Sequence, residues 1–282
     1  MYKVVRKEKL NDAVVRMEIE APFIARKAQA GQFIIFRVNE QGERVPLTIA
    51  DYDREKGTIT IIYQTAGKST LELAALNVGE SILDVVGPLG VPTHFDPDVK
   101  KVAVVGGGVG CAIAYPQAKA LYDKGVSVDV IAGFRNKDIV ILEDEFKAVS
   151  DRMILTTDDG SYGKKGFVTT ALQELIDEGT RYDAVVAIGP VPMMKFICEV
   201  TRPYNIKTIV SLNPIMVDGT GMCGGCRVTV GGKIRYACVE GPDFDGHLVD
   251  FDELSKRNAT YREREQNETA HFCRLTGGLR NA

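Results

Sequence analysis

Lys101-Val-Ala-Val-Val-Gly-Gly-Gly-Val-Gly110 is the stretch of the sequence that decides the fold. Its apolar first half predicts a buried strand, and its glycine-rich second half predicts a tight turn where that strand ends. A helix from Cys111 to Leu121 should follow directly. A strand that passes through a turn into a helix is the repeating unit of α/β domains, so we expect such a domain here.

The residues downstream continue this alternation, which predicts a doubly wound parallel sheet over residues 98–212. The expected strands are 126–131, 153–156 and 184–188, and the expected helices are 143–149 and 169–178. Ligands of such sheets bind at the carboxyl ends of the strands. Three glycine-bearing strand ends therefore predict a dinucleotide site, whose candidate residues are Gly106, Gly107, Gly108, Gly110, Asp158, Asp159, Gly160, Gly189, Pro190 and Met193.

The residues at the positions that usually distinguish NAD from NADP enzymes do not decide between the two cofactors here. Cys111 stands at the third glycine position of the nucleotide-binding pattern. No acidic residue follows the second strand, where NAD enzymes usually contact the ribose; Arg135, a further candidate binding residue, and Lys137 stand there instead. Asp129 lies inside that strand, so we expect it to be packed or paired with another side chain.

Residues 1–97 predict a small antiparallel β-barrel. Runs of β-branched and aromatic residues at 13–20, 32–37 and 58–63 are separated by glycine and proline, as in a series of short strands. The segment 69–76 is the one helix expected among them. Many short strands with little helix are typical of a barrel.

Two segments of this barrel carry candidate flavin-binding residues. Arg44-Val-Pro46-Leu47-Thr48 places an arginine and a hydroxyl at a strand start stiffened by proline, and Gly67-Lys68-Ser69-Thr70 opens a helix. Free amides at a helix N-terminus form a phosphate site. We expect the second segment to hold a pyrophosphate and the first to hold the flavin ring and its phosphate linkage. Both patterns also occur as ordinary strand starts and helix caps.

A cysteine-rich loop follows the nucleotide domain: Asp218-Gly-Thr-Gly-Met-Cys223-Gly-Gly-Cys226, with Cys238 beyond it. Plant-type iron–sulfur proteins use Cys-x4-Cys-x2-Cys and a remote fourth cysteine, and this loop has that spacing with aspartate in the first place. The glycines permit a tight turn around the sulfurs. The loop therefore predicts a [2Fe–2S] cluster with the ligands Asp218, Cys223, Cys226 and Cys238. A structural zinc site and reduced cysteines without any ligand are the alternatives, and only the iron–sulfur protein would be brown.

The composition bounds the classes of function. A chain of 282 residues with 45% hydrophobic and 26% charged residues predicts a globular protein of two or more domains. A net charge of −3 argues against general binding to nucleic acid or to anionic membranes. The lack of a long apolar run and of a signal-peptide pattern predicts a cytoplasmic protein. In that reducing compartment we expect Cys111, Cys198 and Cys273 to be small packing residues.

These segments together resemble the ferredoxin–NADP reductase superfamily, and more closely the electron-transfer subunit of dihydroorotate dehydrogenase. In that group an Arg-x-Pro-x-Ser/Thr strand binds FAD, which matches the segment from Arg44 to Thr48, and a Gly-x-Ser/Thr-Thr helix start matches Gly67 to Thr70. Gly-Pro-Leu-Gly at 87–90 and Gly-Pro-x-Pro-Met-Met at 189–194 also fit. The resemblance implies that Tyr63 and Gly87 belong to the cofactor-binding set. It divides the chain into an FAD-binding barrel (1–97), an NAD-binding domain (98–212) and a [2Fe–2S] segment with a C-terminal tail (213–282).

Asp218 is the departure from the orotate-linked subunits, which have cysteine there. With aspartate at this position, the chain resembles the small subunit of the NADH-dependent reduced ferredoxin:NADP oxidoreductases, which are electron-bifurcating enzymes. The resemblance implies hydride exchange with NAD(H), single-electron transfer through the cluster, and a larger partner flavoprotein. That partner would hold FAD and two [4Fe–4S] clusters and would act on ferredoxin and NADP(H).

The sequence supplies few groups for acid–base catalysis, in keeping with an enzyme whose cofactors carry the chemistry. None of its three histidines lies in a nucleophile or acid–base pattern. The alternatives are the electron-transfer subunit of an NAD-dependent dihydroorotate dehydrogenase and, from another class, a zinc-stabilised binding module without redox activity. The charged segments 252–257 and 261–265 predict exposed helix at the C-terminal end.

Overall fold

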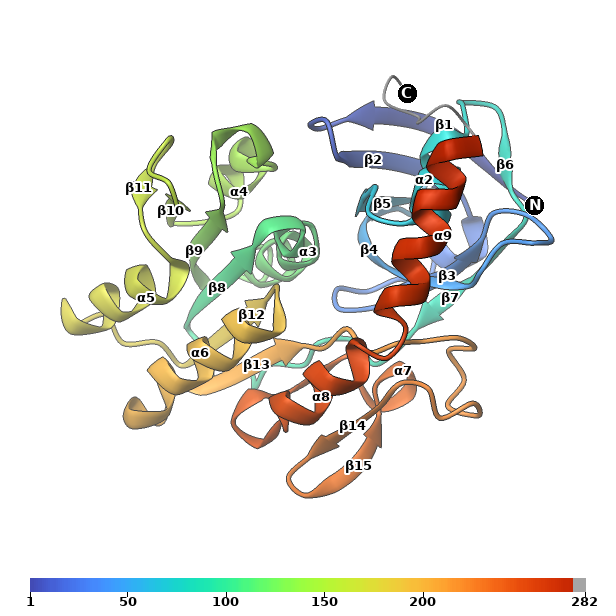
Figure 1. The fold of residues 1–282 in the computed structure, drawn as a ribbon. Helices are drawn as coiled ribbons and strands as arrows, with labels where there is room; N and C mark the ends of the chain where they lie inside the picture. The colour runs from blue at the N-terminus through green and yellow to red at the C-terminus, as the bar shows by residue number, and fades with distance from the viewer. Residues whose placement is uncertain (276–282) are drawn as a thin grey trace.

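The parallel sheet predicted around Lys101–Gly110 forms the centre of the computed structural model, which describes residues 1–275 and the side chains of residues 1–272. Its strand order is β11-β10-β9-β8-β12-β13-β16 (Figure 1). The strands are β8 (Lys101–Gly107), β9 (Ser127–Phe134), β10 (Arg152–Thr157), β11 (Lys164–Lys165), β12 (Ala184–Ile188), β13 (Lys207–Ser211) and β16 (Asp243–Asp245). All neighbouring pairs are parallel except β13 and β16, and the order reverses at β8, as in a doubly wound sheet.

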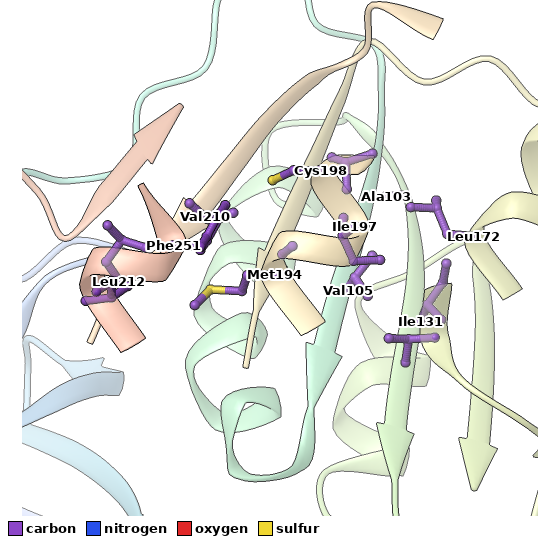
Figure 2. Close-up of a cluster of buried hydrophobic side chains, with 14 of the residues drawn as sticks. Ala103, Val105, Ile131, Leu172, Met194, Ile197, Cys198, Val210, Leu212 and Phe251 are labelled. Atoms are coloured by element: carbon purple, nitrogen blue, oxygen red, sulfur yellow. The ribbon is translucent and has the colours of Figure 1, made fainter. Parts of the chain in front are cut away.

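Helices cover both faces of this sheet because its central strands are apolar on both sides. Val102 and Val104 of β8 belong to the core under the first pair of helices, and Ala103 and Val105 belong to the core under the second pair (Figure 2). The four helices are α3 (Cys111–Tyr122), α4 (Glu143–Ala148), α5 (Val168–Asp177) and α6 (Val191–Thr201). Short 3₁₀ turns lie at η1 (Gly108–Gly110), η2 (Lys137–Ile139) and η3 (Arg202–Tyr204). Each buried valine stabilises the fold by roughly 1.5–3 kcal/mol.

The N-terminal part is an antiparallel, nearly closed barrel, as predicted. Its seven strands follow the order β6-β1-β2-β5-β4-β3-β7. They are β1 (Tyr2–Lys9), β2 (Val14–Glu20), β3 (Phe33–Arg37), β4 (Val45–Asp53), β5 (Thr58–Gln64), β6 (Ser81–Ile82) and β7 (Asp84–Leu89). Alternate side chains such as Met17 and Ile19 of β2 fill the interior. The predicted helix is present as α2 (Lys68–Ala75), and a short helix α1 (Pro22–Ala25) was not predicted.

The C-terminal part is built onto the parallel sheet. Its elements are β14 (Arg227–Val230), β15 (Lys233–Tyr236), α7 (Ala237–Glu240), η4 (Gly246–Leu248), α8 (Phe251–Asn258) and α9 (Arg262–Leu275). β14 and β15 form a hairpin, whereas β16 pairs antiparallel with β13. The sheet thus crosses the predicted boundary at residue 212. The two predicted exposed helices correspond to α8 and α9. Helix α8 is exposed only in part, because its Phe251 and Leu254 are buried, and α9 lies beside α2 (Figure 1).

The barrel, the nucleotide sheet and the C-terminal part are joined by polar contacts. Lys119 Nζ of α3 contacts Asp51 Oδ1 of β4 at 3.0 Å. Asp243 of β16 accepts hydrogen bonds from the Thr93 hydroxyl and, at 3.0 Å, from Gln117 Nε2 of α3. The Asp243 carboxyl therefore connects the linker after the barrel, a helix of the parallel sheet and the C-terminal part.

Two smaller expectations are also settled by the fold. Asp129 is buried and paired, as predicted, with Lys101 Nζ at 3.3 Å and the Tyr182 hydroxyl at 2.7 Å. Cys111 and Cys198 are buried packing residues, whereas the side chain of Cys273 lies outside the described residues. No helix within residues 1–275 has the length and apolarity needed to cross a membrane.

Candidate functional site

A cleft of about 1010 Å³ lies at the carboxyl ends of the parallel strands. The turns after β8, β9, β10, β12 and β13 form one wall, and Asn11, Ala13, Val14 and Gln64 of the barrel form the other. The strand ends meet there because parallel strands joined by helices all finish at the same edge of a sheet. The cleft therefore has the position expected of a nucleotide site.

The structure brings most of the predicted nucleotide residues to this cleft. Those that line it are Gly107, Gly108, Gly110, Arg135, Asp158, Gly189, Pro190 and Met193. Gly106, Asp159 and Gly160 are outside the lining. A Cβ atom on Gly106 would lie 2.8 Å from Cys111 Sγ, so that glycine permits close packing of β8 and α3. Asp159 Oδ1 instead accepts the Ser161 amide at 2.9 Å and closes the turn after β10.

Two glycines in the cleft are required by close approach. A Cβ atom on Gly107 would lie 2.4 Å from Met193 Sδ, and one on Gly110 would lie 2.5 Å from the Ile188 carbonyl oxygen. A side chain at Gly110 would push the turn after β8 away from the backbone at the end of β12, whereas one at Gly107 would displace the end of the Met193 side chain of α6. The glycine run thus keeps the N-terminus of α3 open toward the cleft, where its backbone amides can receive a phosphate.

Sequence reasoning missed several residues of the cleft. Thr156 Oγ1 and Asn11 Nδ2 are buried there and have no hydrogen-bond partner among the described residues. Phe167 and Phe196 also line the cleft and are 62% and 55% exposed, which is unusual for phenylalanine. Unpartnered polar atoms and exposed rings fit a ligand with hydroxyl groups and a planar base. Asn11 and Gln64 had no signal in the sequence, because they reach the cleft only through the packing of the barrel on the sheet.

The two predicted flavin segments lie side by side on the barrel. Ser69 Oγ, in the first turn of α2, donates to Glu43 Oε2 beside Arg44 at 3.4 Å. Thr70 Oγ1 accepts the amides of Ala66 and Gly67, each at 3.1 Å, so its hydroxyl caps the helix. Arg44 is exposed, whereas Pro46, Leu47 and Thr48 are half-buried on β4. Among the described residues of the cleft lining, Gln64 comes nearest in sequence to the α2 segment.

Tyr63 and Gly87 are placed differently from the rest of this set. The Tyr63 side chain points into the barrel and is 1% exposed, and its burial raises the pKa of the phenol well above its usual value. Its hydroxyl has no partner among the described residues. Gly87 lies on β7, where a Cβ atom would approach Ile34 Cγ2 to 2.8 Å. Only the backbone of Tyr63 and of Gly87 is available to a ligand of the Arg44 face.

The predicted cluster loop is held by its own backbone. The carboxylate of Asp218 accepts the amides of Thr220 (Oδ1) and Cys223 (Oδ2), both at 2.8 Å. The Thr220 amide is the main cause that lowers the pKa of this carboxyl. Cys226 and Cys238 are buried, with their sulfurs 3.1 Å apart, and Cys223 is exposed. Within residues 1–272 no three His, Cys, Asp or Glu side chains converge in a metal-binding arrangement.

The donors of this loop nevertheless fit an iron–sulfur cluster. Burial, followed by the contact with Cys226, raises the pKa of the Cys238 thiol to about 12, and binding of iron by Cys226 and Cys238 would replace their protons. Backbone amides already point at sulfur: that of Gly225 at Cys223 Sγ and that of Cys238 at Cys226 Sγ, each at 3.4 Å. Such N–H···S contacts are among the features that set the potential of a cluster.

Fold and site together define a ferredoxin-reductase-like protein: an antiparallel barrel, a doubly wound sheet with a cleft between them, and a cysteine-bearing C-terminal part. Residues 213–250 match the iron–sulfur cluster binding domain of dihydroorotate dehydrogenase B. This match covers β14, β15, α7 and β16 as well as the cysteine loop.

Similarity to known proteins extends over nearly the whole chain. This chain is 53% identical to an uncharacterized protein of the adh 3' region of Clostridium beijerinckii, and the match covers 94% of this chain and 92% of that protein. It is 47% identical to a homolog of the dihydroorotate dehydrogenase B (NAD(+)) electron transfer subunit from Thermotoga maritima, covering 98% and 97%. The chain belongs to the family of these electron transfer subunits and their homologs.

A solved structure is similar at the same level. It is a chain of the NADH-dependent reduced ferredoxin-NADP oxidoreductase structure, which was reported for its insights into flavin-based electron bifurcation. The TM-score is 0.91 at 46% identity, with 96% of this chain and 98% of that chain covered. The family resemblance predicted from the sequence is thereby confirmed.

Proposed function

We propose that this chain is the FAD- and [2Fe–2S]-containing electron-transfer subunit of an electron-bifurcating, NADH-dependent ferredoxin:NADP oxidoreductase. It exchanges a hydride with NAD(H) and passes single electrons through the cluster to a partner flavoprotein. The observation that carries the proposal is the full-length similarity to a chain of the NADH-dependent reduced ferredoxin-NADP oxidoreductase structure.

The connection between the cleft and the cluster loop supports this function. Ser211 and Asn213 line the cleft, and the chain runs from Asn213 directly into the loop that begins at Asp218. A nucleotide in the cleft and a cluster in the loop would be held by one continuous segment on one sheet. The position of the cluster loop is thereby tied to the position of the nucleotide cleft.

The residues of each site have defined tasks in this proposal. Arg44, Pro46, Leu47 and Thr48 on β4 hold the flavin, Lys68, Ser69 and the amides after Gly67 receive its phosphates, and the backbone of Tyr63 and Gly87 adjoins it. The amides of Gly107, Gly108 and Gly110 hold the nucleotide phosphates, and Arg135 and Asp158 contact the ribose side. Asp218, Cys223, Cys226 and Cys238 hold the cluster. The bound groups supply the redox chemistry, so the protein contributes binding and orientation rather than acid–base catalysis.

The finer features of the assembly follow from the same proposal. The partner is a larger flavoprotein subunit with FAD and two [4Fe–4S] clusters, through which ferredoxin and NADP(H) react, and the complex is cytoplasmic. The divisions at 97 and 212 separate the flavin, nucleotide and cluster functions, although β16 returns to the sheet of the second part.

The proposal predicts the behaviour of the isolated chain. Purified without oxygen, it should contain flavin and iron, oxidise NADH with an artificial acceptor such as ferricyanide, and fail to reduce NADP. The reason is that the described residues contain one parallel nucleotide-binding sheet and one flavin-binding barrel, and the proposal assigns the reaction with NADP to the partner subunit. Transfer from NADH to NADP by the chain alone, at the rate of the complex, would contradict the two-subunit proposal.

Electron transfer to a dihydroorotate dehydrogenase is the second candidate function. Two observations favour it: the match of residues 213–250 and the name of the Thermotoga maritima relative. Orotate formation by a complex purified through this chain would establish it. The zinc-binding alternative has no support among these matches, and flavin bound to the purified chain would exclude it.

A further inference from the structure

Helix α8 packs on the same core as the cluster loop. Phe251 and Leu254 are buried in a cluster of side chains that also contains Cys226 and Cys238. The Asp250 side chain accepts the Glu253 amide at 2.9 Å and caps the start of the helix. The helix is therefore a fixed support, and its last turn faces the segment from residue 213 to residue 225.

Two consecutive side chains of that last turn hold this segment at both of its ends. Arg257 Nη2 donates to the Gly225 carbonyl oxygen at 3.1 Å, and Asn258 Nδ2 donates to the Asn213 carbonyl oxygen at 3.2 Å. Asn213 lines the nucleotide cleft, and Gly225 lies inside the Cys223–Cys226 turn. The end of α8 thus fixes the cluster loop relative to the cleft.

A second arginine also donates a hydrogen bond to the turn between Cys223 and Cys226. Arg227 Nη1 donates to the carbonyl of Gly224 at 3.1 Å, so adjacent carbonyls of the turn each face a guanidinium group. Arg227 is exposed, and water screens its charge. Arg257 is half-buried, and its Nε atom is buried without a partner among the described residues. The Arg257 charge therefore acts at closer to its full strength on whatever the loop binds.

We propose that Arg257 is a positioning residue that fixes the Gly224–Gly225 turn and raises the reduction potential of the cluster. This rests on the proposed function, since it requires a cluster in the loop. Reduction adds one negative charge to the cluster, and a nearby fixed positive charge stabilises the reduced form. Net charge and hydrogen bonding are among the features that set the potentials of iron–sulfur centres.

The test compares three variants of the full chain, purified without oxygen. Arg257→Gln removes the charge, Arg257→Lys keeps a charge but loses the planar donor group, and Lys256→Gln removes an exposed neighbouring charge. Iron and sulfide content report occupancy, and a redox titration followed by electron paramagnetic resonance reports the midpoint potential. We expect Arg257→Gln to have a more negative potential, Arg257→Lys to lie near the wild type, and Lys256→Gln to equal it.

An unchanged potential in Arg257→Gln, or an equal shift in Lys256→Gln, would overturn the proposal. If Arg257→Gln retains no cluster, Arg257→Lys decides: an occupied cluster with the wild-type potential supports the role, and loss of iron from both variants with an intact fold leaves only the positioning role and overturns the effect on the potential. A wild-type chain without an iron–sulfur signal would instead count against the proposed function.

Discussion

At the scale of single residues, Asp218 combines two tasks that experiments can separate. Its carboxylate shapes the loop through the amides of Thr220 and Cys223, and we propose that it is also a cluster ligand. A carboxylate oxygen donates less electron density to iron than a thiolate does. Replacing thiolates by weaker donors raises the potential in Rieske centres, although that exchange also changes the charge.

We predict that Asp218→Cys keeps the cluster and lowers its potential, and that Asp218→Ala makes the cluster labile. Asp218→Asn is the intermediate variant, because asparagine keeps one of the two side-chain acceptors for the loop amides but not the charge. If iron content, potential and paramagnetic signal of Asp218→Ala equal those of the wild type, the residue only shapes the loop. The measurements are iron analysis and a redox titration.

Arg44 is predicted to hold the flavin. It precedes β4, next to the Glu43 side chain that accepts from Ser69 of α2. A hydrogen bond to a charged group contributes about 1.5–3 kcal/mol, so Arg44→Ala should weaken FAD binding by roughly 10- to 150-fold. Arg6→Ala, an exposed position on β1, is the control. Equal flavin retention by both variants after gel filtration would contradict the assignment.

At the scale of elements, the regular α/β units could be predicted and the additions to them could not. The strand at 184–188 is predicted with its observed bounds, and the predicted helix 169–178 is displaced by one residue from α5. Helix α6 and the strands β13 and β16 were missed. The three residues of β16 have no periodicity of their own, and their pairing with β13 depends on the fold of the segment between them.

The residues of the candidate sites were also predicted only in part. Glycines at strand ends located the cleft, since sharp turns need them at defined positions, but most of its lining residues were not predicted. Asn11 and Thr156 were missed because their polar atoms acquire meaning only through burial beside the cleft. Tyr63 entered the cofactor-binding set through the family resemblance, whereas the alternation of β5 turns its side chain into the barrel core.

The contact between β16, α3 and the linker predicts a pH effect. Burial raises the pKa of Asp243, despite its hydrogen bonds with Thr93 and Gln117. A carboxyl whose pKa is higher in the folded state than in the unfolded chain stabilises the fold less as pH rises from about 4 through the folded value. Asp243→Asn should remove this loss, stabilising the protein at pH 8 by about 1.4 kcal/mol per unit of raised pKa.

The measurement is the apparent midpoint of thermal unfolding between pH 4 and pH 8. The gain of Asp243→Asn over the wild type should be small near pH 4, where the folded carboxyl is neutral and the unfolded one is about half ionised, and should grow as pH rises toward the folded pKa. A gain that is independent of pH, or a loss at pH 8, would contradict the prediction. Asp245→Asn, an exposed position at the other end of β16, is the control.

At the scale of the whole molecule, the C-terminal part is inseparable from the sheet that it follows. β16 pairs with β13 through Ile209, Val210 and Ser211, and Pro242 accepts the Leu212 amide at 2.9 Å. Buried Phe251 (Figure 2) and Leu254 belong to the same core as Met194 and Ile197 of α6. The cluster loop therefore takes its position from the nucleotide domain as much as from its own glycines.

The antiparallel pairing of β16 also closes the side of the sheet that would otherwise invite self-association. A fragment of residues 1–212 would keep β13 paired with β12 but leave its other edge unpaired beside apolar side chains, and open edges of this kind recruit other chains. We expect that fragment to form aggregates that bind thioflavin T, whereas a fragment of residues 1–260 should elute as one species from gel filtration. A monodisperse 1–212 fragment would contradict this expectation. The same short strand that carries Asp243 thus protects the solubility of the folded chain.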